Sequence, residues 1–186
     1  MELTDAITGR RAIRDYTSAP VDEATIRRLI AAAALAPSAV NEQPWVFTVV
    51  RNRGLLDQMS VAAKAHMRTR PPAGASPQPS RSMLDDATFH IFYHAPVLIV
   101  VSAASPSPWI VEDCTLAAEN LMLAAYAAGL GSCWIGLAQS YCNTEEGKAA
   151  LGLAATATAV APIIVGHPNA PSPATPRHPP EIRWLD

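Results

Sequence analysis

The stretch Ala36-Pro37-Ser38-Ala39-Val40-Asn41-Glu42-Gln43-Pro44-Trp45 joins a helical pattern to the apolar run Val46-Phe47-Thr48-Val49-Val50. Pro37 ends the helix, because proline lacks a backbone N–H and its ring clashes with the preceding turn. The β-branched residues that follow predict a strand over 45–50. A junction with two prolines, two amides and a serine is more polar and rigid than a connector needs. We therefore expect it to present a fixed set of hydrogen-bonding groups.

Composition points to one globular domain without a strongly charged partner. The chain has 186 residues, 49% of them apolar, and a net charge of -2. This balance gives no electrostatic reason to expect nucleic acid or an anionic membrane as a partner. Of the 14 basic residues only Lys64 and Lys148 are lysines. Arginine suits bidentate contact with phosphate or carboxylate, although an Arg- and Ala-rich genome would give the same bias.

The cysteines and the first residues favour a reducing compartment, and the histidines give no sign of a metal site. Three cysteines without CxxC spacing argue against a disulfide framework. The N-terminal residues lack an apolar signal segment, and no stretch reaches the length of a membrane span. The five histidines are scattered, so we expect no metal site. A cytoplasmic protein is the expectation that follows.

Further helices are predicted over 2–9, 22–36, 55–67, 112–128 and 144–151, and further strands over 95–103, 132–137 (a short strand or loop) and 158–165. This order lacks a strict βαβ rhythm and favours the α+β class. Residues 70–82 are rich in proline and predict a mobile lid loop. We place one domain over 1–165 and an extended tail over 166–186. The acidic residues on the helix over 112–128 are interpreted as capping and packing.

Three arginines lie within five residues, at Arg10, Arg11 and Arg14. Their guanidinium groups repel one another unless an anion or acidic side chains lie between them. A phosphate group would relieve that repulsion, because its oxygens match the guanidinium fork. The alternative is a solvated basic turn, neutralised by Asp5 and Asp15.

Together, the Arg-Arg-Ala-Ile-Arg element and the Ala-Pro-Ser-x-x-Asn-x-Gln-Pro-Trp element resemble the signature of the FMN-dependent nitroreductase family. The resemblance implies that Arg10 and Arg11 contact the phosphate and ribityl chain of FMN, and that Arg14 lies near the N1 edge of the ring. The family usually has serine where this chain has Ala12. A phosphate hydrogen bond worth about 1–2 kcal/mol is then missing, although the backbone N–H of Ala12 can still serve.

The resemblance assigns the junction to the second subunit. It implies that Pro37, Ser38 and Ala39 reach the flavin that is bound mainly by the other chain. Asn41 and Gln43 would fix the junction and the polar edge of the flavin. The competing interpretation is that Asn41 caps a local turn and Gln43 lies on the surface.

The stretch Gly129-Leu130-Gly131-Ser132-Cys133-Trp134-Ile135-Gly136 follows a helix and does not match a dinucleotide-binding glycine motif. It resembles a Gly-Leu-Gly stretch of nitroreductases, which implies that Ile135 and Gly136 approach the flavin. The family also closes its phosphate site with a basic residue near the C-terminus. Arg177 matches that position, with Arg183 as the rival and a loose basic tail as the alternative.

The resemblance implies an α+β fold with a central mixed, mostly antiparallel sheet surrounded by helices, in an intertwined homodimer with FMN at the interface. It further implies ping-pong hydride transfer from NADH or NADPH, through flavin N5, to a nitroaromatic, quinone or activated alkene. No catalytic side chain is required, since the chemistry takes place on the cofactor. The alternative from the same scaffold is an FMN-binding or sensing protein without catalysis. A plain interaction domain would require the motif match to be chance.

Overall fold

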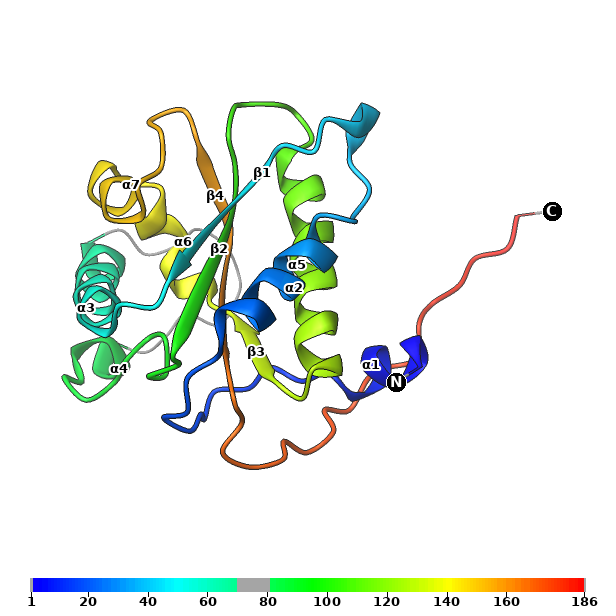
Figure 1. Ribbon diagram of the computed structural model, residues 1–186, viewed down its shortest axis with the longest axis horizontal. Helices are drawn as coiled ribbons and strands as arrows, with labels where there is room; N and C mark the ends of the chain where they lie inside the picture. Colours follow the sequence, from blue (N-terminus) through cyan, green and yellow to red (C-terminus); the bar gives the residue numbers. More distant parts are fainter. Residues whose placement is uncertain (1, 70–80, 186) are drawn as a thin grey trace.

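The computed structural model of the chain describes residues 2–69 and 81–185. Its centre is a four-stranded sheet in the order β1-β2-β4-β3, and all neighbouring strands are antiparallel (Figure 1). The strands are β1 (Trp45–Val50), β2 (Val97–Ala103), β3 (Gly131–Trp134) and β4 (Thr158–Gly166). Every residue of β2 is buried. A strand covered on both faces is a continuous apolar run, and β2 has that sequence.

Helices cover both faces of this sheet. Val97, Ile99 and Val101 of β2 pack into one core, while Leu98 and Val100 pack into the other. Alternation is expected, because successive side chains of a strand point to opposite faces. The first core lies under α2 (Glu23–Ala33) and α5 (Ile110–Ala127); the second lies under α3 (Arg53–Thr69), α6 (Gly136–Cys142) and α7 (Glu145–Leu151).

Two short helices complete the described chain. α1 (Leu3–Gly9) packs against α5, and α4 (Arg81–Asp85) packs against α3. Gly9 permits the first contact, because a Cβ at this position would lie 2.0 Å from the Tyr126 hydroxyl oxygen. The N-terminal segment is thereby drawn to the last turn of α5.

The structure confirms the predicted α+β class and most of its elements. The strand over 45–50 has the predicted bounds, and Asp22 caps α2 by accepting a hydrogen bond from the Thr25 N–H at 2.8 Å. Helix α6 was not predicted, because its residues follow a strand directly and Gly136 is a poor helix former. Burial of Ala138, Tyr141 and Cys142 compensates for that weak propensity.

The lid loop predicted over 70–82 lies mostly outside the described residues. Its last two residues, 81 and 82, begin α4. Among the described residues, no helix is both long and apolar enough to cross a membrane.

Asn143 joins α6 to the central sheet at an irregular point. Its Nδ2 donates to the backbone oxygens of Gln139 (2.9 Å) and Ala159 (2.8 Å), and its Oδ1 accepts from the Ala159 N–H at 2.9 Å. The pairing of β2 with β4 shifts register beside Ala159. Asn143 therefore supplies hydrogen bonds where the strand ladder is interrupted.

We expect Asn143→Ala to lower the free energy of unfolding by about 2–4 kcal/mol, since it leaves the buried Ala159 N–H and carbonyl without these partners. Urea unfolding measures the change. Asn169→Ala, which removes one exposed 3.3 Å contact to Asp15, is the matched control and should change it by less than about 0.5 kcal/mol. Equal stability of the two variants would contradict this role.

Candidate functional site

The arginine-bearing segment lies along the edge strand β3. The Ile13 N–H donates to the Ser132 carbonyl at 3.0 Å, and Ala12 forms a parallel bridge with Ser132. A Cβ on Gly131 would lie 2.8 Å from the side chain of Ile13. This glycine is needed because a larger residue would push the arginine segment away from the sheet.

Arg11 is held by its neighbours, and its buried Nε has no partner among the described residues. Its Nη1 donates to the backbone oxygens of Thr8 (2.7 Å) and Arg10 (2.8 Å), whereas its Nε is buried without a hydrogen-bond partner among the described residues. Arg10 lies nearby, with its Nε 3.5 Å from the Glu119 carboxylate. Buried donors are nearly always paired, so the bare Nε marks Arg11 as a candidate ligand for an anion.

Two cavities open beside this segment. One of about 230 Å³ lies between Arg10, Arg11 and the end of α5 at Tyr126, and one of about 320 Å³ lies beside 12–15. Residues 170–172 form a wall of both. The chain after β4 is brought there by the hydrogen bond from the Thr17 N–H to the His167 carbonyl (2.9 Å). The arginine segment and the start of the tail thus border the same open space.

Arg14 and the buried groups around it complete this region. Its guanidinium carbon lies 6.0 Å from the centre of the Tyr93 ring. Burial raises the pKa of the Cys133 thiol, and the positive charges of Arg14 and Arg10 oppose that rise only in part. Burial likewise raises the pKa of Tyr16, whose hydroxyl donates to the Ile13 carbonyl at 2.6 Å. Cys133 and Tyr16 therefore remain protonated at neutral pH and serve as packing groups.

The predicted junction forms a short, strained loop around a 3₁₀ turn (Ala39–Asn41). Val40, Asn41 and Gln43 have φ values of 44°, 59° and 49°. Left-handed backbone is costly for a β-branched residue such as Val40, and it persists only where the surroundings enforce it. The loop is internally braced: the Gln43 N–H donates to Ser38 Oγ (2.9 Å), and Gln43 Nε2 donates to Asn41 Oδ1 (3.0 Å).

Asp113 anchors this loop from the first turn of α5. Its side chain is buried, and Oδ1 accepts a hydrogen bond from the Ala39 N–H at 2.9 Å. The sequence interpretation gave this acid only a capping and packing role. No local pattern could have identified the contact, because 74 residues separate Asp113 from Ala39.

Within one chain, the junction and the arginines lie near opposite ends of helix α5. Asp113 holds the junction near the start of α5, and Tyr126 borders the arginine cavity near its end. Thirteen residues of helix correspond to a rise of about 20 Å. Figure 1 shows the same separation, with the junction above the sheet and the N-terminal segment below it. One chain therefore brings Arg10, Arg11, Ala12 and Arg14 together but not the loop over 37–43.

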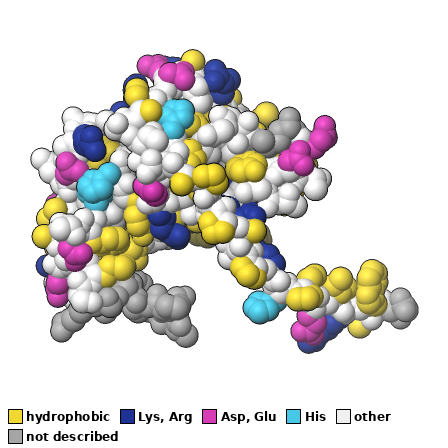
Figure 2. Space-filling model, turned by 90° about the horizontal axis from the view of Figure 1, so that it is seen from below, with side chains coloured by type: hydrophobic (Ala, Val, Ile, Leu, Met, Phe, Trp, Pro, Cys, Tyr) yellow, Lys and Arg dark blue, Asp and Glu magenta, His cyan; other side chains and the backbone are white. Residues whose placement is uncertain are grey.

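The remaining predicted residues are placed differently. Ile135 is buried at the end of β3, where its N–H donates to the Pro162 carbonyl at 2.8 Å. Gly136 is exposed, and apart from its chain neighbours and the backbone of its own helix no described atom lies within 4 Å of the position its Cβ would take. Arg177 lies on the tail, whose residues 169–185 are all exposed and whose end projects from the body (Figure 2). Arg177 lines neither cavity of its own chain.

We expect Asp113→Ala to loosen the junction, because it leaves the Ala39 N–H without its buried acceptor, at a cost of about 1–3 kcal/mol. Amide hydrogen exchange over residues 38–43 should accelerate. Glu112→Ala, which alters the exposed neighbouring acid, is the control and should leave the exchange of this loop unchanged. Unaltered exchange in Asp113→Ala would show that the loop is held by other contacts.

Comparison with known proteins identifies the family. The family model described as the Nitroreductase family matches residues 7–167. A protein of Methanothermobacter thermautotrophicus named NADH dehydrogenase/NAD(P)H nitroreductase is 38% identical over 142 residues, which cover 74% of this chain and 62% of that protein. A similarly named protein of Archaeoglobus fulgidus is 34% identical over 171 residues, covering 90% of this chain and 86% of the relative.

Solved structures give the same result. A nitroreductase with bound FMN from Bacteroides fragilis superimposes with a TM-score of 0.86 at 26% identity, over 100% of both chains. A second nitroreductase with bound FMN, from Desulfitobacterium hafniense, gives a TM-score of 0.80 at 25% identity, also over 100% of both chains. The family model covers most of the described chain, and the fold agrees throughout. The chain belongs to the nitroreductase family of oxidoreductases.

Proposed function

We propose that this protein is an FMN-dependent oxidoreductase that passes a hydride from NADH or NADPH to a small acceptor such as a nitroaromatic, a quinone or an activated alkene. The observation that carries the proposal is the arginine segment. Arg11 has a buried, unpartnered donor, and Arg10 and Arg11 border a cavity. Solved nitroreductases of the same fold hold FMN, whose phosphate would supply an acceptor for the unpartnered donor of Arg11.

The residues beside the two cavities fit the phosphate and the ribityl chain of FMN. Arg10 and Arg11 would bind the phosphate, since their forks match its oxygens and its charge relieves their mutual repulsion. The backbone of Ala12 lies beside the larger cavity, where the ribityl chain would extend. Arg177 would reach the phosphate from the tail of a second copy, since it lines neither cavity of its own chain.

FMN would supply the redox chemistry, taking up a hydride and giving it to the acceptor in a ping-pong cycle. The chain's task is binding and orientation. Arg14 would place a positive charge where negative charge accumulates on reduction, which favours the reduced form. Gly136 would allow close approach of the ring, because no side chain fills the space above it. Solvent can supply the protons, so no acid–base pair is needed.

We further propose that the active unit is a homodimer. The junction and the arginines lie about 20 Å apart along α5, so the junction of one chain would complete the site of the other. Apolar side chains exposed on the tail, α1 and α5 provide surface for this association. They are Ile182, Trp184, Leu185, Leu3, Ile7, Val111 and Leu116.

A visible spectrum of the purified protein, followed by anaerobic addition of NADH and then NADPH, tests the proposal. We expect flavin bands that bleach within seconds, and the faster donor identifies the co-substrate. Bands that persist would favour the non-catalytic FMN-binding alternative. A colourless protein that takes up no added FMN would overturn the proposal.

We expect Arg11→Ala to weaken FMN binding at least about tenfold, since it removes a charge-assisted contact to the phosphate. Ala12→Ser should instead strengthen binding up to about tenfold by adding a hydroxyl donor. Fluorescence titration with FMN measures both. Arg27→Ala is the control, because Arg27 is exposed and, among the described residues, pairs with Glu23 of the same helix. Equal affinity of Arg11→Ala and Arg27→Ala would remove Arg11 from the phosphate site.

A complementation experiment tests the shared site. Arg11→Ala damages the arginine half, and the double variant Asn41→Ala with Gln43→Ala damages the junction half. Each homodimer should have low activity. After unfolding and refolding together, about a quarter of wild-type activity should return, because half of the dimers are mixed and each of these has one intact site. No recovery, with mixed dimers verified by mass spectrometry, would place both halves in one chain.

A further inference from the structure

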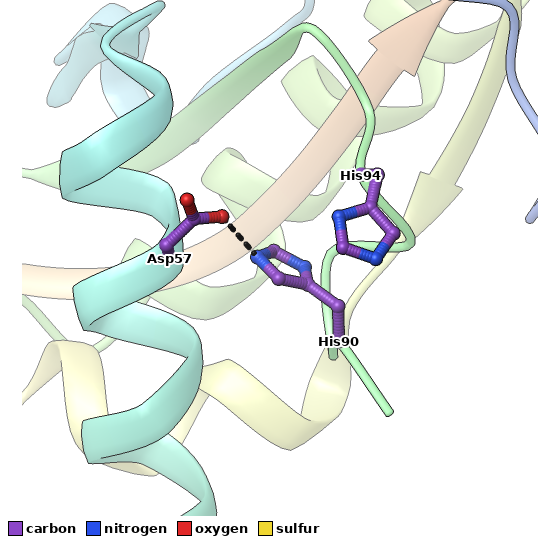
Figure 3. A group of neighbouring side chains, drawn as sticks. All are labelled: Asp57, His90 and His94. Carbon is purple, nitrogen blue, oxygen red and sulfur yellow. Dashed lines mark hydrogen bonds and ion pairs between the residues drawn. The ribbon is translucent and has the colours of Figure 1, made fainter. Parts of the chain in front are cut away.

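Three metal-binding side chains meet on the α3 face of the molecule. Asp57 projects from α3, and His90 and His94 project from the turns that precede β2 (Figure 3). Each offers one ligand atom, and all three atoms lie within 4.8 Å of one another. The expectation from the sequence that the chain has no metal site overlooked the H-x3-H spacing of His90 and His94.

The backbone is distorted where it delivers the second histidine. Tyr93 and His94 have φ values of 50° and 53°, two consecutive left-handed residues that are not glycine. Such conformations persist where the surrounding structure enforces them and often mark functional segments. Here the distortion brings the His94 ring alongside the His90 ring, with ring centres 4.4 Å apart.

We propose that Asp57, His90 and His94 bind a divalent transition-metal ion of the Zn²⁺ class. His90 Nε2 and Asp57 Oδ1 are 3.1 Å apart, close to the roughly 3.3 Å between two ligands of a tetrahedral zinc ion. Asp57 and His94 are exposed, so their side chains can rotate to bring the third ligand closer. Two imidazoles and one carboxylate suit Zn²⁺ better than Mg²⁺ or Ca²⁺, which prefer oxygen ligands.

The surroundings favour a site of moderate affinity. His90 Nδ1 accepts a hydrogen bond from the Phe92 N–H at 3.2 Å, so in neutral His90 the proton lies on Nε2 and is donated to Asp57. A metal ion would displace that proton from Nε2, and its transfer to Nδ1 would break the contact with Phe92. Arg51 and Arg53 line the cavity of about 170 Å³ beside His94, and their charges repel a cation. Three protein ligands also leave a coordination position for water.

The site is adjacent to the proposed flavin region but does not depend on it. Tyr93 lies between the two histidines in sequence, and its ring faces Arg14 at 6.0 Å. Activity assays would therefore mix two effects. The test uses direct metal binding, which stays informative whether or not the proposed function is correct.

The experiment titrates Zn²⁺ into the purified, tag-free protein after EDTA treatment, with isothermal calorimetry as the readout. We expect one ion per chain, and excess Mg²⁺ should not compete. Asp57→Asn and His94→Gln should each weaken Zn²⁺ binding at least about tenfold, since ligand loss exceeds the 10–100-fold effects of outer contacts. His178→Gln, which changes a histidine on the exposed tail, is the matched control and should bind like the wild type.

Co²⁺ provides a second readout. Visible absorption of a low-symmetry cobalt complex should appear beyond the flavin bands with the wild-type protein and with His178→Gln, and should be lost in His94→Gln. Far-ultraviolet circular dichroism verifies that the variants are folded. Absence of Zn²⁺ binding to the wild type, or equal binding by the wild type, Asp57→Asn and His94→Gln, would overturn the proposal.

Discussion

The close approach of Ile13 to the edge strand β3 is the constraint on which the arginine site depends. It requires a position without a side chain, which Gly131 provides, and it is held by the hydrogen bond to the Ser132 carbonyl. Because the segment cannot move away from the sheet, Arg10 and Arg11 are directed to the space between α5 and the start of the tail. Without this approach the three arginines would be a solvated basic turn.

The junction at the other end of α5 is positioned by a different interaction, a hydrogen bond to a buried side chain. A buried carboxylate on α5 accepts one backbone N–H, and the loop beyond it has three left-handed residues. Each such residue costs about 1–3 kcal/mol, while a hydrogen bond to a charged acceptor contributes about 1.5–3 kcal/mol. The anchor can therefore offset only part of the strain. The exposed amides of Asn41 and Gln43 are held by their contact with each other and by the bond from the Gln43 N–H to Ser38 Oγ.

The segment before β2 links two chemically different regions. His90 and His94 face Asp57 on α3, whereas Tyr93 between them faces Arg14. The left-handed backbone at Tyr93 and His94 is what turns neighbouring side chains toward different partners. A change in the conformation of this segment would therefore move side chains both at Asp57 and at Arg14. This is a physical reason why the strained backbone is retained.

By itself, the sequence determined the features that depend on residues close together in the chain: local secondary structure, helix capping and short motifs. The β-branched run defined β1, Asp22 defined the start of α2, and the arginine and Asn-x-Gln-Pro-Trp motifs indicated the family. The weak propensity of Gly136 concealed α6, which forms because its apolar side chains are buried against α3 and β4.

Only the tertiary structure decided which distant residues meet. Asp113 contacts Ala39 across 74 residues, and Asp57 contacts His90 across 33. These pairings follow from how the helices pack on the sheet, and no local spacing encodes them. The same packing places the junction and the arginines at opposite ends of α5. The motifs drew attention to the arginines and to the junction, but the fold decided that one chain keeps them apart, because a rigid helix separates them.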